Sequence, residues 1–336
     1  MSAQPASKAQ QPRLAFLGVG WIGRNRLEAI AQSGYARIVA VSDATREAAT
    51  EVVQDLPEAR VVDSLDALLA INPDGVVIAT PSGLHAPQTV AALEQGAAVF
   101  CQKPLARAAH ETQQVIDAAK RADRLLSVDF CYRLVHGMPR LRELVRTGEL
   151  GRIYAVDLVF HNAYGPDKSW FYNLAQSGGG CVMDLGIHLV DLALWVLDFP
   201  SVTQVSSRLY AQGAVLAKPV NELEDFAVAQ FELEGGATAR MACSWRLSAG
   251  QDAVIEVSFY GTRGGARLRN ISGSFYDFSV ERFNGTARET LGAYPDAWGG
   301  RTILTWAQHL ARDPRFDPDV QHVMQVAEVV DAVYGR

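Results

Sequence analysis

Apolar and polar residues follow two different patterns along the chain. Over residues 12–130, short apolar runs are followed by longer segments in which apolar residues recur every three or four positions. The runs predict buried strands and the longer segments predict helices. Strands are predicted at 13–17, 37–43, 60–62, 75–80, 97–102 and 125–130, with helices at 22–31, 45–55, 65–71, 86–95 and 108–122. Strands and helices that alternate in this way predict an α/β fold with a doubly wound parallel sheet.

The pattern changes after residue 130. A helix is predicted at 138–147, followed by strands at 153–161, 202–210, 225–233, 238–245 and 253–260. Three more helices are predicted at 182–197, 301–311 and 320–334. These strands alternate in polarity and are separated by glycine-rich turns, which predicts a large, mainly antiparallel sheet in an α+β domain. We therefore expect two domains, 12–130 and 131–336.

The second half has too few helices to cover both faces of its sheet. An exposed apolar sheet face is a common subunit interface, so we expect a homodimer or homotetramer formed through the C-terminal sheet.

Composition narrows the class of protein. The 336 residues are 49% hydrophobic and 20% charged, which is enough for a sizeable core. A net charge of −6 argues against nucleic acid as a partner. We find no unbroken apolar run of the roughly 18 residues that span a bilayer, and residues 1–11 have the polarity of a disordered tail. None of the four cysteines forms a C-x-x-C pair, which is typical of reduced cysteines in a cytoplasmic protein.

A glycine motif follows the first predicted strand directly. Gly18, Gly20 and Gly23 form Gly-x-Gly-x-x-Gly, with Trp21 and Ile22 at the start of the next helix. A strand before this motif and a helix after it are the context of a dinucleotide fingerprint. In that fold the glycines allow a tight turn and let the backbone approach a pyrophosphate at the helix N-terminus. This motif predicts an N-terminal Rossmann domain that binds a dinucleotide.

An acidic residue at the end of the second strand bears on which dinucleotide is bound. Asp43 lies where a carboxylate can accept hydrogen bonds from the adenosine ribose hydroxyls. The same carboxylate would repel the extra phosphate of NADP, although Arg46 could attract it. We therefore expect NAD rather than NADP. Asp43 could instead cap the following helix.

Two segments lie at the carboxyl ends of predicted strands, where open α/β sheets bind ligands. The first contains Thr80, Pro81, Ser82 and His85, and His85 either reaches the cofactor or substrate or simply begins a helix. In the second, Lys103 follows Gln102 at the end of the fifth strand. A lysine in a partly desolvated pocket can exchange a proton with a substrate hydroxyl, although most lysines are solvated.

A third segment combines acidic residues with a histidine in the predicted helix 182–197. Asp184 and His188 are four residues apart, so they share a helix face, and Asp191 is three residues further on. A carboxylate beside an imidazole is a general acid–base arrangement. A buried structural pair or a metal site would use the same residues, but no third His or Cys ligand is evident, and we predict no metal.

Taken in order, these motifs resemble the Gfo/Idh/MocA family, the group of glucose–fructose oxidoreductase and inositol dehydrogenase. The resemblance covers residues 13–334 and also includes Tyr132-Arg133, Gly179-Gly180 with Gly186, and the turn 261–264. It implies a Rossmann domain followed by an α/β domain whose open sheet often forms subunit interfaces. It also implies oxidation or reduction of sugars, polyols and related hydroxy compounds with NAD or NADP.

The resemblance also implies roles for individual residues. It identifies Lys103 as the catalytic lysine and Asp184 with His188 as the acid–base pair, in which His188 takes the hydroxyl proton. The family usually reads Glu-Lys-Pro where this chain reads Gln102-Lys103-Pro104, and that glutamate normally contacts the nicotinamide ribose. The residues predicted to bind the cofactor are Gly18, Gly20, Trp21, Ile22, Gly23, Asp43, Arg46, Thr80, Pro81, Ser82, His85, Gln102 and Lys103. Those predicted to bind the substrate are Lys103, Tyr132, Arg133, His161, Trp170, Asp184 and His188.

Two alternatives to a dehydrogenase remain. Some relatives oxidise their substrate transiently with NAD and then cleave a glycosidic bond or eliminate. A non-catalytic NAD-sensing protein could also use the same scaffold, although a sensor has no need of Lys103, Asp184 and His188.

Overall fold

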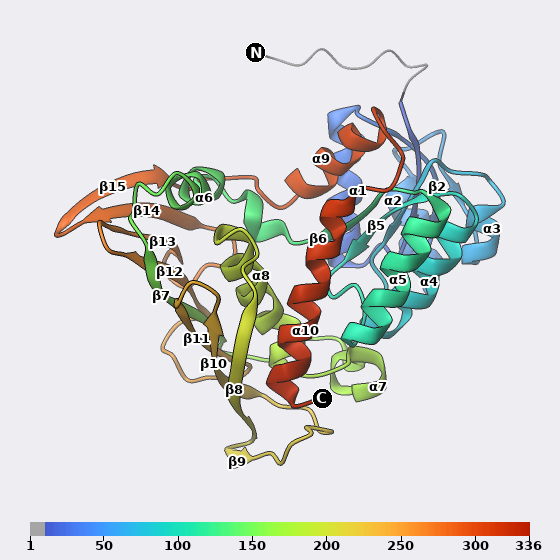
Figure 1. Ribbon diagram of the computed structural model, residues 1–336. Helices are drawn as coiled ribbons and strands as arrows, with labels where there is room; N and C mark the ends of the chain where they lie inside the picture. Colours follow the sequence, from blue (N-terminus) through green and yellow to red (C-terminus); the bar gives the residue numbers. More distant parts are fainter. Residues whose placement is uncertain (1–10) are drawn as a thin grey trace. The chain divides into compact units, whose positions relative to one another are not determined.

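The computed structural model describes residues 11–336, and the chain forms two compact units (Figure 1). The first unit contains the described residues up to 106 together with 110–131 and 299–321. The second contains residues 107–109, 132–298 and 322–336. The predicted N-terminal tail lies outside the described residues except for Gln11.

The first unit is built on a six-stranded sheet with the order β3-β2-β1-β4-β5-β6. All of its strand pairs are parallel, as the alternating pattern predicts. The order reverses between β1 and β4, and a doubly wound sheet binds ligands at such a switch point. The strands are β1 (Arg13–Leu17), β2 (Arg37–Ser42), β3 (Arg60–Val61), β4 (Gly75–Ile78), β5 (Ala98–Gln102) and β6 (Leu126–Asp129).

Helices pack on both faces of this sheet, which explains why its strands are almost continuously apolar. Phe100 on β5 contacts Trp306 on one face, with ring centroids 5.6 Å apart, and the neighbouring Cys101 faces Thr89 on the other. The helices of the unit are α1 (Trp21–Ser33), α2 (Arg46–Val53), α3 (Leu65–Leu69), α4 (Ser82–Glu94), α5 (Ala109–Ala122), α9 (Arg301–Leu310) and the 3₁₀ turn η5 (Pro318–Gln321).

Helix α9 belongs to the first unit, although the sequence pattern placed its residues in the second domain. Its buried side chains Ile303, Trp306 and Leu310 join the apolar cluster formed by α1 and the parallel strands. Amphipathic spacing shows that a helix has an apolar face but does not show which sheet that face covers. The chain therefore returns to its first unit after residue 298.

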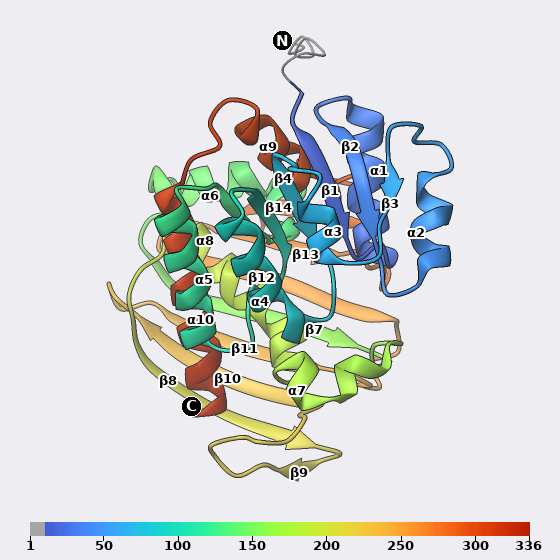
Figure 2. The ribbon, with the colours of Figure 1, turned by 90° about the vertical axis from the view of Figure 1, so that its right-hand side faces the viewer.

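The second unit contains a nine-stranded sheet with the order β15-β14-β13-β12-β7-β11-β10-β8-β9 (Figure 2). Only the β7–β11 pair is parallel, so the prediction of a large, mainly antiparallel sheet is confirmed. The strands are β7 (Ile153–Asn162), β8 (Val202–Ala211), β9 (Ala214–Val215), β10 (Phe226–Leu233), β11 (Thr238–Ser244), β12 (Ala253–Gly261), β13 (Gly265–Asn270), β14 (Phe278–Asn284) and β15 (Ala287–Gly292).

Helices of the same unit cover one face of this sheet. Helix α10 packs on β8, α8 packs on β7 and β12, and α6 packs on β13, β14 and β15. The helical elements are η2 (Cys131–Leu134), α6 (Met138–Arg146), η3 (Ser169–Tyr172), α7 (Leu174–Ser177), the π-helical turn η4 (Val182–Gly186), α8 (Ile187–Val196) and α10 (His322–Tyr334).

The segment Leu174–Val196 is long and apolar enough to span a bilayer by length and composition, although polar residues interrupt it. However, 94% of its most apolar 18-residue window is buried within the structure, as in a core helix.

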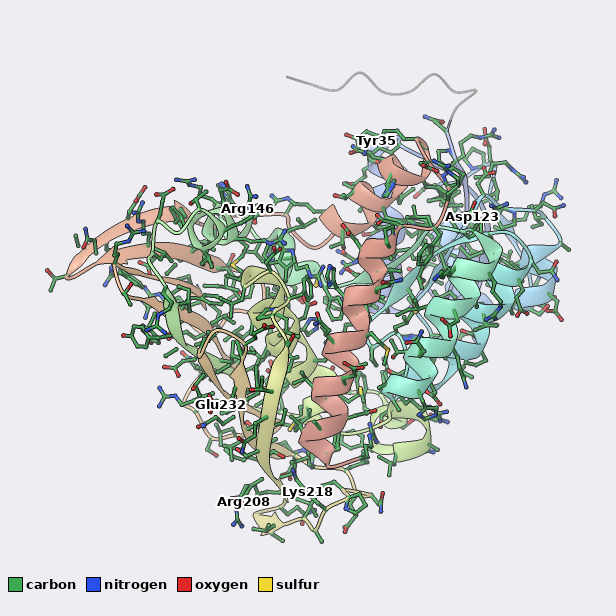
Figure 3. All side chains as sticks on the ribbon, in the orientation of Figure 1. Tyr35, Asp123, Arg146, Arg208, Lys218 and Glu232 are labelled. Carbon is green, nitrogen blue, oxygen red and sulfur yellow. The ribbon has the colours of Figure 1, made fainter. Side chains whose placement is uncertain are left out.

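The opposite face of the sheet carries ion pairs between neighbouring strands. Arg240 binds Asp157 on the adjacent strand, and Arg267 binds Glu281. Arg208 and Glu232, labelled in Figure 3, stand on the same face by strand register. We expected this open face to be apolar, and that expectation is wrong. Many of the side chains that point outward from these strands are charged and form ion pairs.

Four strands were not predicted from the sequence: the two-residue β9 and the strands β13 to β15. In β13 to β15, arginine and glutamate occupy positions on both faces, and Leu268 and Val280 are among the few buried apolar residues. Apolar residues therefore occupy too few consecutive positions to give a clear period of two.

Candidate active site

The glycine motif forms a tight turn between β1 and α1. Gly18 has φ +88°, and a Cβ atom there would lie 2.6 Å from the Ala79 carbonyl oxygen. A Cβ on Gly23 would overlap the Gly18 carbonyl oxygen, whereas one on Gly20 would meet no atom within 4 Å. The first and last glycines are therefore required by the fold itself. The middle glycine leaves open space in front of the helix N-terminus, where a phosphate group binds.

Asp43 holds this turn from the end of β2. Its Oδ2 atom accepts a hydrogen bond from the Val19 N–H at 2.7 Å, and Oδ1 accepts one from the Thr45 N–H at 2.9 Å. Asp43 therefore holds the turn before α2, but it does not cap that helix, whose N-cap is Thr45. Each carboxylate oxygen retains a second lone pair for a ligand hydroxyl. Arg46 forms an exposed ion pair with Asp63.

His85 contacts two backbone carbonyls instead of pointing toward a ligand. The helix α4 begins at Ser82, four residues earlier than predicted, which places His85 inside its first turn. The ring atom Nδ1 lies 2.6 Å from the Pro104 oxygen and Nε2 lies 2.7 Å from the Thr80 oxygen. Burial lowers the pKa of His85, and a nearby positive charge on Lys103 acts in the same direction. His85 was predicted to contact the cofactor directly. In the structure its ring instead connects the backbone that follows β4 with the backbone that follows β5.

The end of β5 carries Gln102 and Lys103 as predicted. Lys103 is half-buried and follows the strand directly, and Gln102 is only 6% exposed. The side-chain amide of Gln102 donates to the carboxylate of Asp129, the last residue of β6. Asp129 was not among the predicted site residues.

In the second unit, Asp184 and His188 lie on consecutive turns of one continuous helical segment. Asp184 lies in the π-helical turn η4, and His188 lies in the first turn of α8. A straight α-helix was predicted here. A π-helical turn carries one more residue per hydrogen-bonded ring, and such turns occur frequently at functional sites.

Aromatic side chains hold both residues. The Trp245 indole Nε1 donates to Asp184 Oδ2 at 3.0 Å. The Tyr132 ring meets the His188 ring edge to face, with centroids 4.9 Å apart. Tyr132 itself stacks on Trp298, with centroids 5.1 Å apart. The carboxylate therefore has a fixed hydrogen-bond donor, and the imidazole lies against an ordered aromatic cluster.

Trp170, on η3, is connected to Trp245 through the ring of Phe171. Its ring stacks on Phe171 at 3.7 Å between centroids, and Phe171 meets Trp245 edge to face at 6.3 Å. Trp245 also lines a hollow of about 430 Å³ within the second unit, together with Tyr210, Gln212, Gly213, Asp225, Phe226, Arg246 and Leu247.

Asp191 lies three residues after His188 on α8 and has Arg133 as its partner. It is buried and binds the guanidinium of Arg133, with the Nε–Oδ2 distance at 2.9 Å. Burial raises the pKa of Asp191, and the positive charge of Arg133 opposes that shift. Arg133, predicted to bind substrate, is thus placed as the partner of Asp191, and the ion pair ties η2 to α8.

His161 lies on the open face of the nine-stranded sheet and not on the helix-covered face. It is paired with Ser244, and its Nδ1 lies 2.8 Å from Ser244 Oγ. The adjacent Cys243 contacts Cys181 beside η4, and successive strand residues point to opposite faces. The prediction that His161 binds substrate with Asp184 is therefore not supported, because its parity in β7 directs it away from α8.

Residues 13–130 match the oxidoreductase family with an NAD-binding Rossmann fold, and residues 138–267 match the Gfo/Idh/MocA C-terminal domain. The chain belongs to the Gfo/Idh/MocA family. It is therefore an oxidoreductase with an NAD-binding Rossmann domain, as the order of the sequence motifs predicted.

Individual family members are similar over most of the chain. The D-glucoside 3-dehydrogenase of Escherichia coli K12 is 30% identical over 277 residues, which is 76% of each chain. The inositol 2-dehydrogenase of Rhodococcus erythropolis PR4 is 32% identical over 68% of this chain and 64% of its own length. Among solved structures, GenD2 from gentamicin A biosynthesis, in complex with NAD, has a TM-score of 0.81 at 24% identity and covers 99% of this chain. That likeness establishes the fold.

The first unit of this Gfo/Idh/MocA protein fits NAD by its own geometry. The open space at Gly20 admits a pyrophosphate next to the α1 N-terminus, and Asp43 stands at the end of β2. In residues 11–336 we find no cluster of three His, Cys, Asp or Glu side chains that could hold a metal ion. The four cysteines are free and buried, and burial raises the pKa of Cys101 and of Cys131 to about 12.

One further residue supports the site but gave no signal in the sequence. Glu224 is fully buried and accepts hydrogen bonds from the Gly180 N–H at 2.9 Å and the Val182 N–H at 2.8 Å. The Tyr334 hydroxyl donates to the same carboxylate at 2.8 Å. Glu224 therefore caps the segment that leads into η4. It lies in an irregular acidic stretch between strands, where no periodicity distinguishes it from exposed acids.

Proposed function

We propose that this protein is an NAD-dependent dehydrogenase that acts on a hydroxyl-bearing carbon of a sugar, a polyol or a related compound. The observation that carries the proposal is the acid and imidazole on consecutive turns at η4 and α8, each held by an aromatic side chain. A carboxylate and an imidazole so placed suit proton transfer at a hydroxyl. The names of the related glucoside and inositol dehydrogenases support this substrate class.

We assign the following roles to the chain's own residues. Bound NAD would supply the acceptor for the hydride that leaves the substrate carbon. His188 takes the proton of the reacting hydroxyl, and Asp184 supports the cation that forms on its ring. Lys103, at the end of β5, donates a hydrogen bond to a substrate hydroxyl. Tyr132 and Trp245 keep water away from the acid–base pair.

The wider binding set follows from the same proposal. The glycine turn, Trp21 and Ile22 hold the pyrophosphate, Asp43 holds the adenosine ribose, and Thr80, Pro81, Ser82 and Gln102 contribute from the ends of β4 and β5. Trp170 lines the substrate site. Arg133 and His85 act through Asp191 and the backbone, respectively, and Arg46 is held by Asp63.

The first experiment measures NADH formation by absorbance over a panel of sugars and polyols. The oxidation rate is expected to rise with pH through one ionisation between about pH 6 and 8, the range in which imidazole titrates. In His188→Asn the rate should fall on the order of 10²-fold and this ionisation should disappear, while calorimetry shows unchanged NAD binding. An equally active variant with the same pH profile would mean that the Asp184–His188 pair is structural.

Two matched variants sharpen the result. The exposed His110 lies on α5, so His110→Asn should leave both rate and pH profile unchanged. Lys103→Met keeps the side-chain stem and removes the charge, and it should lower turnover on the order of 10²-fold with little change in NAD affinity. Substrate conversion without net NADH would instead indicate an NAD-using glycosidase or lyase. NAD binding without any turnover would indicate a sensor.

We further propose a cytoplasmic homodimer or homotetramer that associates through the open face of the nine-stranded sheet. The free cysteines support a reducing compartment. On the open face, Val228 and Tyr260 are each 38% exposed among the ion pairs, which suits a mixed polar and apolar interface. Light scattering at micromolar concentration should give a multiple of the 36.5 kDa chain mass, and Val228→Glu should reduce it. A monomeric wild-type protein would contradict the proposal.

A further inference from the structure

A buried carboxylate at the end of β6 connects four elements of the first unit. Asp129 is 0% exposed, and its Oδ2 accepts a hydrogen bond from Arg26 Nε of α1 at 2.6 Å. Its Oδ1 accepts one from Thr302 Oγ1 of α9 at 2.5 Å. The Gln102 amide nitrogen at the end of β5 also donates to Oδ2. Asp129 therefore accepts two hydrogen bonds at Oδ2 and one at Oδ1.

One ion pair lies at the centre of this cluster. Arg26 is only 2% exposed and forms an ion pair with Asp129, so one buried cation meets one buried anion. Gln102 adds a neutral donor to the pair. A glutamate at position 102 would place a second carboxylate directly against Asp129, in a region where an unpaired buried charge is costly.

The contact with Asp129 also determines which way the Gln102 amide points. An amide has one end that donates and one end that accepts. Because its nitrogen faces Asp129, the Gln102 carbonyl oxygen remains as an acceptor. Gln102 is the last residue of β5 and precedes Lys103, and open α/β sheets bind their ligands beyond this edge.

We propose that Asp129 is a positioning residue for NAD binding, which orients Gln102 so that its carbonyl oxygen accepts a hydrogen bond from a cofactor hydroxyl. This inference rests on the proposed function. It also explains why glutamine replaces the glutamate that the family usually carries before the lysine. Asp129 holds the negative charge, and Gln102 presents the neutral acceptor.

The test is a charge swap with NAD affinity measured by calorimetry and the thermal midpoint measured without NAD. Gln102→Glu should weaken NAD binding about tenfold or more, because the two carboxylates repel and the amide donor is lost. Asp129→Asn should weaken it similarly and also lower the midpoint, because Arg26 loses its anion. The double variant Gln102→Glu/Asp129→Asn restores one charge and one amide, and its affinity should return to within about threefold of wild type.

Controls separate positioning from general damage. Gln114→Glu adds the same charge at an exposed position of α5 and should change neither quantity. Gln102→Met keeps the side-chain length without the amide, and it should weaken NAD binding several-fold while the midpoint changes little. If the Asp129→Asn proteins fail to fold, the NAD affinity of Gln102→Met still tests whether the Gln102 amide contributes to NAD binding.

Two results would overturn the inference while NAD binding and NADH formation by the wild type uphold the proposed function. One is a Gln102→Glu variant that binds NAD as well as or better than wild type, which would mean that the usual family residue suits this site. The other is a Gln102→Met variant with unchanged affinity. A wild-type protein that does not bind NAD would overturn both the inference and the proposed function.

Discussion

The two segments that carry the chemistry are both glycine-rich helix starts held by a remote carboxylate, but the carboxylates reach them differently. In the first unit, Asp43 binds the Val19 N–H from 24 residues away. In the second, Glu224 binds the Gly180 and Val182 N–H groups from 44 and 42 residues away. Asp43 directly follows β2, the parallel neighbour of β1. In a strand–helix–strand unit, the residue at this position lies beside the turn that follows the first strand. Glu224 comes from an irregular loop.

The surroundings of the two carboxylates also differ. Asp43 is half-buried, so water can solvate whatever charge its two backbone donors leave unsatisfied. Glu224 is fully buried, and the hydrogen-bond donors described for it are backbone N–H groups and the Tyr334 hydroxyl, without a cation. Burial raises the pKa of Glu224, and the hydrogen bonds from Val182 and Tyr334 oppose that shift. The second segment thus depends far more on its single acid.

The largest expected effect is therefore the loss of Glu224. Glu224→Ala leaves two buried N–H groups and the Tyr334 phenol without their acceptor, at about 1–3 kcal/mol for each group. We expect a loss of about 3 kcal/mol or more in the free energy of unfolding, measured by chemical denaturation. Glu222→Ala removes an exposed acid two residues away and should be nearly neutral. A Glu224→Ala protein as stable as this control would show that the cap is dispensable.

The same difference explains what the sequence could predict. The parallel sheet, the glycine turn and Asp43 follow from local periodicity and a topology that repeats, and their positions were predicted closely. The π-helical turn at Asp184 was not, because it depends on Glu224 and Tyr334, which are distant in sequence. Residues whose role is set by one specific tertiary contact leave no period to detect.

Side-chain direction was predicted less well than element position. His161 was predicted to bind substrate from its position in a strand, but its side chain lies on the open face of the sheet. Alternate residues of a strand point to opposite faces, and the sequence does not show which face the helices cover. Asp129 was overlooked because its role depends on contacts with Arg26, Gln102 and Thr302, which are distant in sequence.

A medium effect is expected for cofactor choice in the first unit. The wild-type protein should bind NAD at least about tenfold more tightly than NADP, a difference of about 1.4 kcal/mol, because a carboxylate at the end of β2 repels the extra phosphate. Asp43→Asn keeps the shape and removes the charge, so this preference should largely disappear. Asp55→Asn removes an exposed charge from the same unit and should retain it. Calorimetric titration with both dinucleotides decides, and equal affinities in the wild type would contradict the role of Asp43.

The smallest effect concerns how the stability of the second unit depends on pH. The fold raises the pKa of Glu224 above its value in the unfolded chain, so the folded state holds the Glu224 proton more tightly than the unfolded state does. This contribution to stability is fully present below the unfolded pKa of about 4.3 and is lost as pH rises through the folded pKa. Glu224→Gln has no such proton, and its amide nitrogen opposes one backbone N–H, so it should be less stable than wild type throughout. The gap between the two proteins should widen as pH falls from 8 toward 5, as measured by denaturation at each pH. A difference in stability that narrows over this range would mean that the hydrogen bonds lower the pKa of Glu224 more than burial raises it. The buried Glu224 carboxylate would then be as well stabilised by its donors as the half-buried Asp43 is by its donors and water.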